Sequence, residues 1–139
     1  LEQIKKLDAL HDARRKNFAA LTEIFAPFEK YFHLPKATDK SDPSWFAYLL
    51  TIKPDAPFTR QELVDHFEEA MIQTRSYFSG NILYHPGYQH LAEPYDDMSA
   101  TFPVAHLVTT NSMFLGTYAG ITDDKLEYIK KTVLEFFGD

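Results

Sequence analysis

The first 31 residues repeat apolar positions with the period of an α-helix. The spacings are mostly three, four and seven, which places these positions on one face of a helix. The charged residues Lys5, Lys6 and 14–16 lie mostly off that face, and a basic run of this kind is usually solvated. We therefore predict a helix over residues 1–31, interrupted near Pro27. Its apolar positions are Leu7, Leu10, Phe18, Leu21, Ile24, Phe25 and Phe28.

Three later segments combine aromatic and β-branched residues over lengths that are typical of β-strands. They are residues 44–52, 73–78 and 112–118. The first segment is apolar at nearly every position, which predicts a strand that is buried on both faces. Trp45, the only tryptophan, is interpreted as a core residue.

Signals for helix starts separate these strands. Thr59-Arg-Gln-Glu62 has the spacing of a capping box, and it predicts a helix to about residue 70. Pro103 fits the first turn of a short helix through residue 108. Thr122, followed by two aspartates, has the position of the cap of a last helix, because the positive end of a helix favours carboxylates.

This order of elements predicts the α+β class. We expect a small, mainly antiparallel sheet of about three strands, with helices packed chiefly on one face. Residues 87–101 show no periodicity and carry three carboxylates, which predicts a solvated loop. At 139 residues the chain has the size of one domain. It opens at Leu1 in a helical pattern, which suggests a piece of a longer protein.

Composition excludes several classes of function. The net charge is −6 and no long basic run occurs, which argues against nucleic acid as a partner. The chain has no cysteine, so it contains no disulfide, no cysteine nucleophile and no cysteine metal ligand. No apolar run reaches the roughly 20 residues that a membrane helix needs. No glycine-rich phosphate loop and no complete catalytic triad are present.

Residues 72–86 carry the candidate chemistry. The expected strand contains Arg75, breaks at Ser79-Gly80-Asn81, and continues into a loop with Tyr84 and His85. A rigid strand that ends in a polar loop is a common place for ligand contacts. The sequence alone favours the simpler interpretation of a strand and a surface turn, because Gly and Asn are usual turn residues.

The chain resembles the C-terminal part of the fold-type-I, pyridoxal-phosphate-dependent sugar aminotransferase and dehydratase family. The resemblance covers most of the chain and rests on four motifs. Within the family, Thr-Arg followed by Phe-x-Gly-Asn is similar to the nucleotide-linked 4-keto-6-deoxyhexose 3-dehydratases of lipopolysaccharide biosynthesis. Tyr84-His85-Pro86 departs from the Arg-Gln-Pro of many of them. The motifs are Asp42-Pro-Ser-Trp-Phe46, Ala56-Pro-Phe-Thr-Arg-Gln-Glu-Leu63, Ile72-Gln-Thr-Arg-Ser-Tyr-Phe-Ser-Gly-Asn81 and Asn111-Ser-Met-Phe-Leu-Gly-Thr-Tyr118.

The resemblance implies that residues 1–31 are a connecting helix and that residues 32–139 are the small domain of a cytoplasmic, homodimeric enzyme. The parent enzyme would remove the C3 hydroxyl of a CDP-4-keto-6-deoxyhexose. It would use pyridoxal or pyridoxamine phosphate held by its large domain, and this chain would supply no catalytic residue. Relatives that work with a reductase carry a [2Fe–2S] cluster, whose cysteines would lie upstream. No metal, membrane or nucleic-acid partner is expected for this chain.

The motif positions make Arg75, Asn81, Tyr84, His85 and Asn111 the predicted substrate-binding residues. Each has a structural alternative. Arg75 can instead form an ion pair with one of the glutamates 68 and 69. Asn81 can adopt a left-handed turn beside Gly80. Tyr84 and His85 can line either the pocket or the dimer seam, and Asn111 can tie its loop to a strand.

Two other functions stay open from the sequence. The chain can be the small domain of a 4-aminosugar aminotransferase, although such relatives usually carry a Pro-Leu-His segment where this chain has Ser79-Gly80-Asn81. It can also be a free-standing domain that binds a ligand or a partner.

Overall fold

A four-stranded antiparallel sheet is the centre of the structure, a computed structural model that describes residues 1–138. The strand order is β1-β2-β4-β3, so β2 and β4 are central and β3 is an edge strand. The predicted α+β class is confirmed, with one strand more than expected. The strands are β1 (Phe32–His33), β2 (Ala47–Ile52), β3 (Thr74–Ser76) and β4 (Ser112–Gly116).

Three long helices pack against the sheet, and the first is the helix that the N-terminal periodicity predicts. It begins in a 3₁₀ turn, η1 (Ile4–Lys6), and runs as α1 (Leu7–Phe25) before it changes at Pro27 into η2 (Ala26–Tyr31). The other two are α2 (Arg60–Glu69) and α6 (Asp123–Phe137). No helix within residues 1–138 is long and apolar enough to cross a membrane.

These helices cover only one face of the sheet. Tyr48, Leu50, Met113 and Leu115 point to the covered face and are at most 1 % exposed. Their strand neighbours Ala47, Leu49 and Phe114 point the other way, are half-buried and do not belong to the core. The prediction that residues 44–52 are buried on both faces is therefore wrong for the first part of β2.

The helix-start signals give one confirmed cap and one correction. Thr59 and Glu62 form the predicted capping box: Oγ1 of Thr59 accepts the Glu62 N–H at 3.2 Å, and the Glu62 carboxylate accepts the Thr59 N–H at 2.6 Å. Thr122 has the N-cap position of α6, but its side chain makes no capping bond. Asp123 in the first turn instead forms an ion pair with Lys16 of α1 at 2.6 Å.

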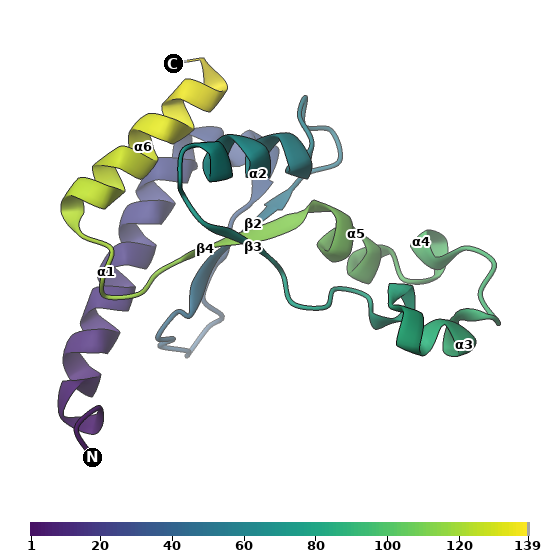
Figure 1. The fold of residues 1–139 in the computed structure, drawn as a ribbon, viewed down its shortest axis with the longest axis horizontal. Helices are drawn as coiled ribbons and strands as arrows, with labels where there is room; N and C mark the ends of the chain where they lie inside the picture. Colours follow the sequence, from purple (N-terminus) through teal and green to yellow (C-terminus); the bar gives the residue numbers. More distant parts are fainter. Residues whose placement is uncertain (139) are drawn as a thin grey trace.

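The chain between β3 and β4 projects from the sheet as an arm, residues 77–111 (Figure 1). The arm contributes no residue to the hydrophobic core. The expected irregular loop at residues 87–101 contains short helical turns, and the helix that starts at Pro103 is longer than predicted. The arm holds η3 (Ile82–Tyr84), η4 (Pro86–Tyr88), α3 (Gln89–Ala92), α4 (Met98–Thr101) and α5 (Pro103–Asn111).

The one-sided core makes a direct stability prediction. Leu50 is fully buried, so replacing it by alanine leaves a cavity and should lower the free energy of unfolding by about 2–5 kcal/mol. Val104 in the arm is 73 % exposed, and Val104→Ala should change the free energy of unfolding by less than about 0.5 kcal/mol. Urea unfolding measures both. Equal effects of the two substitutions would contradict this placement of the core.

Candidate substrate-binding face

The uncovered face of the sheet carries Arg75, the first of the predicted site residues. In β3, Thr74 lies opposite Leu115 and is 7 % exposed, so it points to the core. Arg75 is next along the strand and lies opposite Phe114, so its side chain leaves from the other face. Strand alternation thus places a guanidinium group beside an aromatic ring where no helix covers the sheet.

Glu68 fixes the start of β3 and leaves Arg75 free. Its carboxylate accepts the Thr74 N–H at 2.6 Å and the Thr74 hydroxyl at 2.7 Å. These two bonds lower the pKa of Glu68, and the charge of Arg75 adds a smaller effect in the same direction. Within residues 1–138, no carboxylate lies within the 4.0 Å of an ion pair with Arg75, so the alternative interpretation, a pair with Glu68 or Glu69, is not observed.

Three phenylalanine rings form an exposed cluster on the same face. Phe46 and Phe78 are 62 % and 69 % exposed. Their ring centroids lie 5.8 and 6.0 Å from that of Phe114, and 6.4 Å from each other. Next to the cluster lies an open hollow of about 470 Å³, whose lining includes Arg75, Tyr118 and Arg14 of α1. Aromatic surface beside free cations is suited to an anionic ligand with a flat ring.

A network around Asn17 holds α1 next to the chain that leaves β4. Asn17 is 2 % exposed, and its amide donates to the carbonyls of Tyr118 at 2.9 Å and Thr117 at 3.3 Å. The Thr117 hydroxyl donates to the carbonyl of Trp45 at 2.7 Å. The Trp45 ring stacks on Phe18 with centroids 4.0 Å apart. Trp45 is only half-buried and lies outside the core, so its interpretation as a core residue is wrong. The hollow is therefore built between elements that are far apart in sequence.

The turn at Gly80-Asn81 packs tightly against α5. Gly80 has φ of +59°, and a Cβ there would lie 2.5 Å from Oγ1 of Thr109. The Asn81 N–H donates to that hydroxyl at 2.6 Å, and the Asn81 side-chain oxygen accepts the Leu83 N–H at 3.1 Å. Asn81 has φ of −77°, so the left-handed residue of this turn is Gly80.

The other predicted site residues also make structural bonds. Nδ2 of Asn81 has no hydrogen-bond partner within residues 1–138, and the residue is only 6 % exposed. Tyr84 shares a hydrogen bond with Nδ1 of His106 at 2.6 Å, and Nε2 of His85 contacts the Ser79 carbonyl at 2.7 Å. The Asn111 amide donates to the Ile52 carbonyl at 3.0 Å, which ties α5 to the end of β2.

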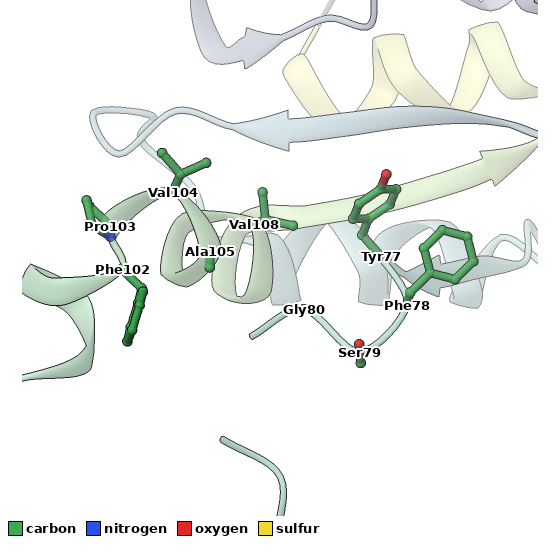
Figure 2. A pocket seen from close by; sticks show the side chains of 9 residues that line it. All are labelled: Tyr77, Phe78, Ser79, Gly80, Phe102, Pro103, Val104, Ala105 and Val108. Carbon is green, nitrogen blue, oxygen red and sulfur yellow. The ribbon is translucent and has the colours of Figure 1, made fainter. Parts of the chain in front are cut away.

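The predicted residues thus occupy three places. Arg75 lies on the sheet face, Asn81, Tyr84 and His85 lie in the first part of the arm, and Asn111 lies where α5 meets β4. Between α5 and the segment that follows β3 is an apolar cleft of about 630 Å³. Figure 2 shows Tyr77 and Phe78 at one end of it, Val104 of α5 toward the other, and Val108 between them. Sequence reasoning missed Arg14, which carries no local signal apart from its basic run.

The described part of the chain lacks the side-chain groups that commonly hold a metal or pyridoxal phosphate. Residues 1–138 contain no cluster of three His, Asp or Glu side chains that could hold a metal. They also contain no buried lysine or carboxylate. A pyridoxal-phosphate pocket uses a lysine and a carboxylate partner for the pyridine nitrogen. The side chains present here do not fit such a pocket by themselves.

Comparisons with known proteins place this fold in a family. The structure matches that of the Escherichia coli GDP-4-keto-6-deoxy-D-mannose-3-dehydratase, solved with bound hydrated PLP, with a TM-score of 0.75 and 24 % identity, over 95 % of this chain and 33 % of that one. Solved aminotransferases share the fold at 13–17 % identity. The model of the DegT/DnrJ/EryC1/StrS aminotransferase family matches residues 1–134, and the chain belongs to that family.

Two curated relatives match over nearly the whole chain. The dTDP-4-dehydro-2,6-dideoxy-D-glucose 3-dehydratase of Saccharopolyspora spinosa is 38 % identical over 98 % of this chain and 29 % of its own length. The lipopolysaccharide biosynthesis protein RfbH of Salmonella typhimurium is 31 % identical over 99 % of this chain and 31 % of its own length. The chain therefore spans about a third of the length of these relatives.

The turn at Gly80 gives a prediction about the arm. Gly80→Ala adds a Cβ at a positive φ and against Thr109, and it should destabilise the turn by about 1 kcal/mol or more. Gly87→Ala is the control, because a Cβ there meets nothing within 4 Å. Amide hydrogen exchange of the Asn81 N–H should accelerate in the first variant only. Unchanged exchange in Gly80→Ala would contradict the tight packing of this turn on α5.

The Glu68–Thr74 bonds predict part of the pH dependence of stability. Because folding lowers the pKa of Glu68 below its ordinary value of 4.5, this stabilisation is present above that value and is lost as pH falls through the folded-state pKa. Glu68→Gln should therefore lose less stability than the wild type between about pH 7 and about pH 3, as measured by urea midpoints.

The matched control is Glu69→Gln, since the side chain of Glu69 makes no hydrogen bond or ion pair within the described residues. This variant should keep the wild-type pH dependence. The same pH dependence in wild type and Glu68→Gln would contradict the assigned role of Glu68.

Proposed function

We propose that the chain is the substrate-contacting small domain of a pyridoxal-phosphate-dependent nucleotide-sugar 3-dehydratase. The parent enzyme removes the C3 hydroxyl of a nucleotide-linked 4-keto-6-deoxy sugar. One observation carries the proposal: the 38 % identity, over 98 % of the chain, with a protein named as a 3-dehydratase. The motif Thr74-Arg75 with Phe78-x-Gly80-Asn81 agrees with this choice within the family.

The structure supports a role in binding rather than in bond breaking. The uncovered face of the sheet presents the Arg75 guanidinium, which has no carboxylate partner within residues 1–138, and these residues include no buried lysine, histidine, aspartate or glutamate. A guanidinium group binds anionic oxygens in pairs, which fixes the orientation of a phosphate or carboxylate. In this role Arg75 positions the substrate, and Tyr84 and His85 border it from the arm.

The cofactor belongs to the rest of the parent protein in this proposal. Bound there, pyridoxal or pyridoxamine phosphate supplies the electron sink that loss of a hydroxyl next to a keto group requires. A [2Fe–2S] cluster, where the parent uses one with a reductase, has its cysteines outside this chain, which has none. The homodimer is likewise a property proposed for the parent.

The nucleotide of the substrate is left open among nucleoside diphosphates. The sequence motifs suggested a CDP sugar, while relatives of this chain have names that specify dTDP and GDP sugars. The lipopolysaccharide pathway is proposed from the motifs and from the name of the Salmonella relative.

A second candidate is a nucleotide-sugar aminotransferase. The name of the family and the solved aminotransferases that share the fold favour it. The two reactions differ in their product, because a dehydratase removes an oxygen atom from the sugar and an aminotransferase adds a nitrogen atom.

The test is the product that the full-length parent forms from a nucleotide-linked 4-keto-6-deoxy sugar. The reaction consumes two electrons, so the mixture contains pyridoxamine phosphate, glutamate as amino and electron donor, and the reductase where the parent uses one. Mass spectrometry should show a sugar that has lost its C3 oxygen. A product that has gained an amino group would overturn the proposal in favour of the aminotransferase.

Kinetics of an Arg75 variant test the role of the chain. Arg75→Gln should lower kcat/KM by about tenfold or more, because it removes a charge-assisted contact worth about 1.5–3 kcal/mol. Arg15→Gln is the control, since Arg15 is already paired with Asp42 at 2.8 Å. Wild-type kinetics in Arg75→Gln would remove Arg75 from the site.

A further inference from the structure

Two arginines from distant parts of the sequence line one hollow on the uncovered face. Arg14 comes from the middle of α1, and Arg75 comes from the edge strand β3. Arg14 precedes Asn17 and Phe18 by three and four residues, so all three lie on the same side of the helix. Because Asn17 is bonded to the Tyr118 carbonyl, Arg14 is held next to the chain that leaves β4.

Both guanidinium groups lack a carboxylate partner within residues 1–138. The chain carries 20 acidic and 14 basic residues, so partners are not scarce. On α1 the next two residues each have one: Arg15 pairs with Asp42 at 2.8 Å, and Lys16 pairs with Asp123 at 2.6 Å. Near β3, the carboxylate of Glu68 is engaged by Thr74.

A third arginine extends this positive region along the sheet edge. Arg60 in the first turn of α2 donates to the Ser76 hydroxyl at 3.2 Å. Arg60, Arg75 and Ser76 line a second hollow of about 440 Å³, which shares Arg75 and Ser76 with the first. Arg14, Arg60 and Arg75, the arginines without a carboxylate partner within residues 1–138, therefore line two adjoining hollows of a chain whose net charge is −6.

The walls of the first hollow are aromatic. Phe46 and Tyr118 are 62 % and 57 % exposed, and Phe114 lies between β2 and β3 in the sheet. A bare inorganic anion would contact the arginines but leave these rings in water. A ligand that joins an anionic group to a flat ring uses both features, because a ring stacks on aromatic side chains while the anion pairs with guanidinium groups.

We propose that this hollow binds the nucleoside diphosphate part of the ligand, with the diphosphate between Arg14 and Arg75 and the nucleoside against Phe46, Phe114 and Tyr118. The choice of a nucleoside diphosphate rests on the proposed function, in which the substrate is a nucleotide-linked sugar. Arg14 becomes a binding residue, although its sequence context is that of a solvated basic run. Arg60 adds positive potential at one end of the site.

Isothermal titration calorimetry of the full chain with thymidine diphosphate tests the site. Arg14→Gln and Arg75→Gln should each weaken binding by about tenfold or more, as expected for loss of a contact to a charged group. Arg15→Gln is the matched control one position along α1, and it should bind as the wild type does. Circular dichroism should show the same fold for all four proteins.

Pyrophosphate and thymidine separate the two halves of the ligand. Thymidine diphosphate should bind more tightly than either, and Phe46→Ala should weaken its binding without changing that of pyrophosphate. Any one of three outcomes would overturn the proposal. They are wild-type affinity in Arg14→Gln, no binding of thymidine diphosphate by the wild type, and equal affinities for pyrophosphate and thymidine diphosphate.

Failure of this site and failure of the proposed reaction are distinguishable. A parent enzyme that adds nitrogen to the sugar would refute the dehydratase assignment, while the effect of Arg14→Gln on nucleotide binding would still support the site. Loss of oxygen from the sugar, with wild-type nucleotide binding in Arg14→Gln, would refute the site alone.

Discussion

The structure depends on one constraint: over residues 47–50 and 113–116, the central strands β2 and β4 bury only one face. Their register pairs Tyr48 with Leu115 and Leu50 with Met113, and the helices α1, α2 and α6 cover these side chains. The alternate positions must then face away from the helices. One face of the sheet thereby packs in the hydrophobic core, and the other face is available to contact a ligand or the rest of the parent protein.

The exposed half has properties that a solvated surface does not need. Exposed aromatic rings in a contiguous patch lower solubility unless something contacts them, and guanidinium groups without carboxylates leave charge uncompensated. Phe46, Phe78 and Arg75 combine both features, and the network around Asn17 adds Arg14 from a separate helix. The chain also matches only about a third of the length of its relatives. Both observations agree with the proposal that this domain contributes one face of a site that the rest of the parent protein completes.

Local signals in the sequence predicted most of the scaffold. The capping box at Thr59 and Glu62 and the apolar stripe of α1 depend only on near neighbours, so they are readable from spacing. The two-residue strand β1 was missed because it exists only through its pairing with Thr51 and Ile52. The second predicted segment, residues 73–78, extends beyond β3 at both ends, since an edge strand pairs on one side only. Thr122 shows that a suitable residue at a cap position does not guarantee the bond.

The candidate site was less accessible to sequence reasoning than the fold. Strand alternation identifies the face of Arg75 only once Thr74 is known to be buried. The turn between α2 and β3 decides whether the Glu68 carboxylate binds Thr74 or pairs with Arg75, and the sequence does not record the shape of that turn. The place of Arg14 follows from contacts between residues about a hundred positions apart, which no local pattern records. Asn81 and Asn111 match a family motif, but only the structure shows which backbone groups they bind.

The central claim is that the uncovered face of the sheet, and not the helical layer, meets the ligand. The most direct test is a nuclear magnetic resonance titration of the isotopically labelled chain with thymidine diphosphate. Amide shifts should concentrate in β3, from the end of β4 through Tyr118, and around Arg14. Shifts centred on α2 and α6, or no shifts at a saturating concentration, would contradict it.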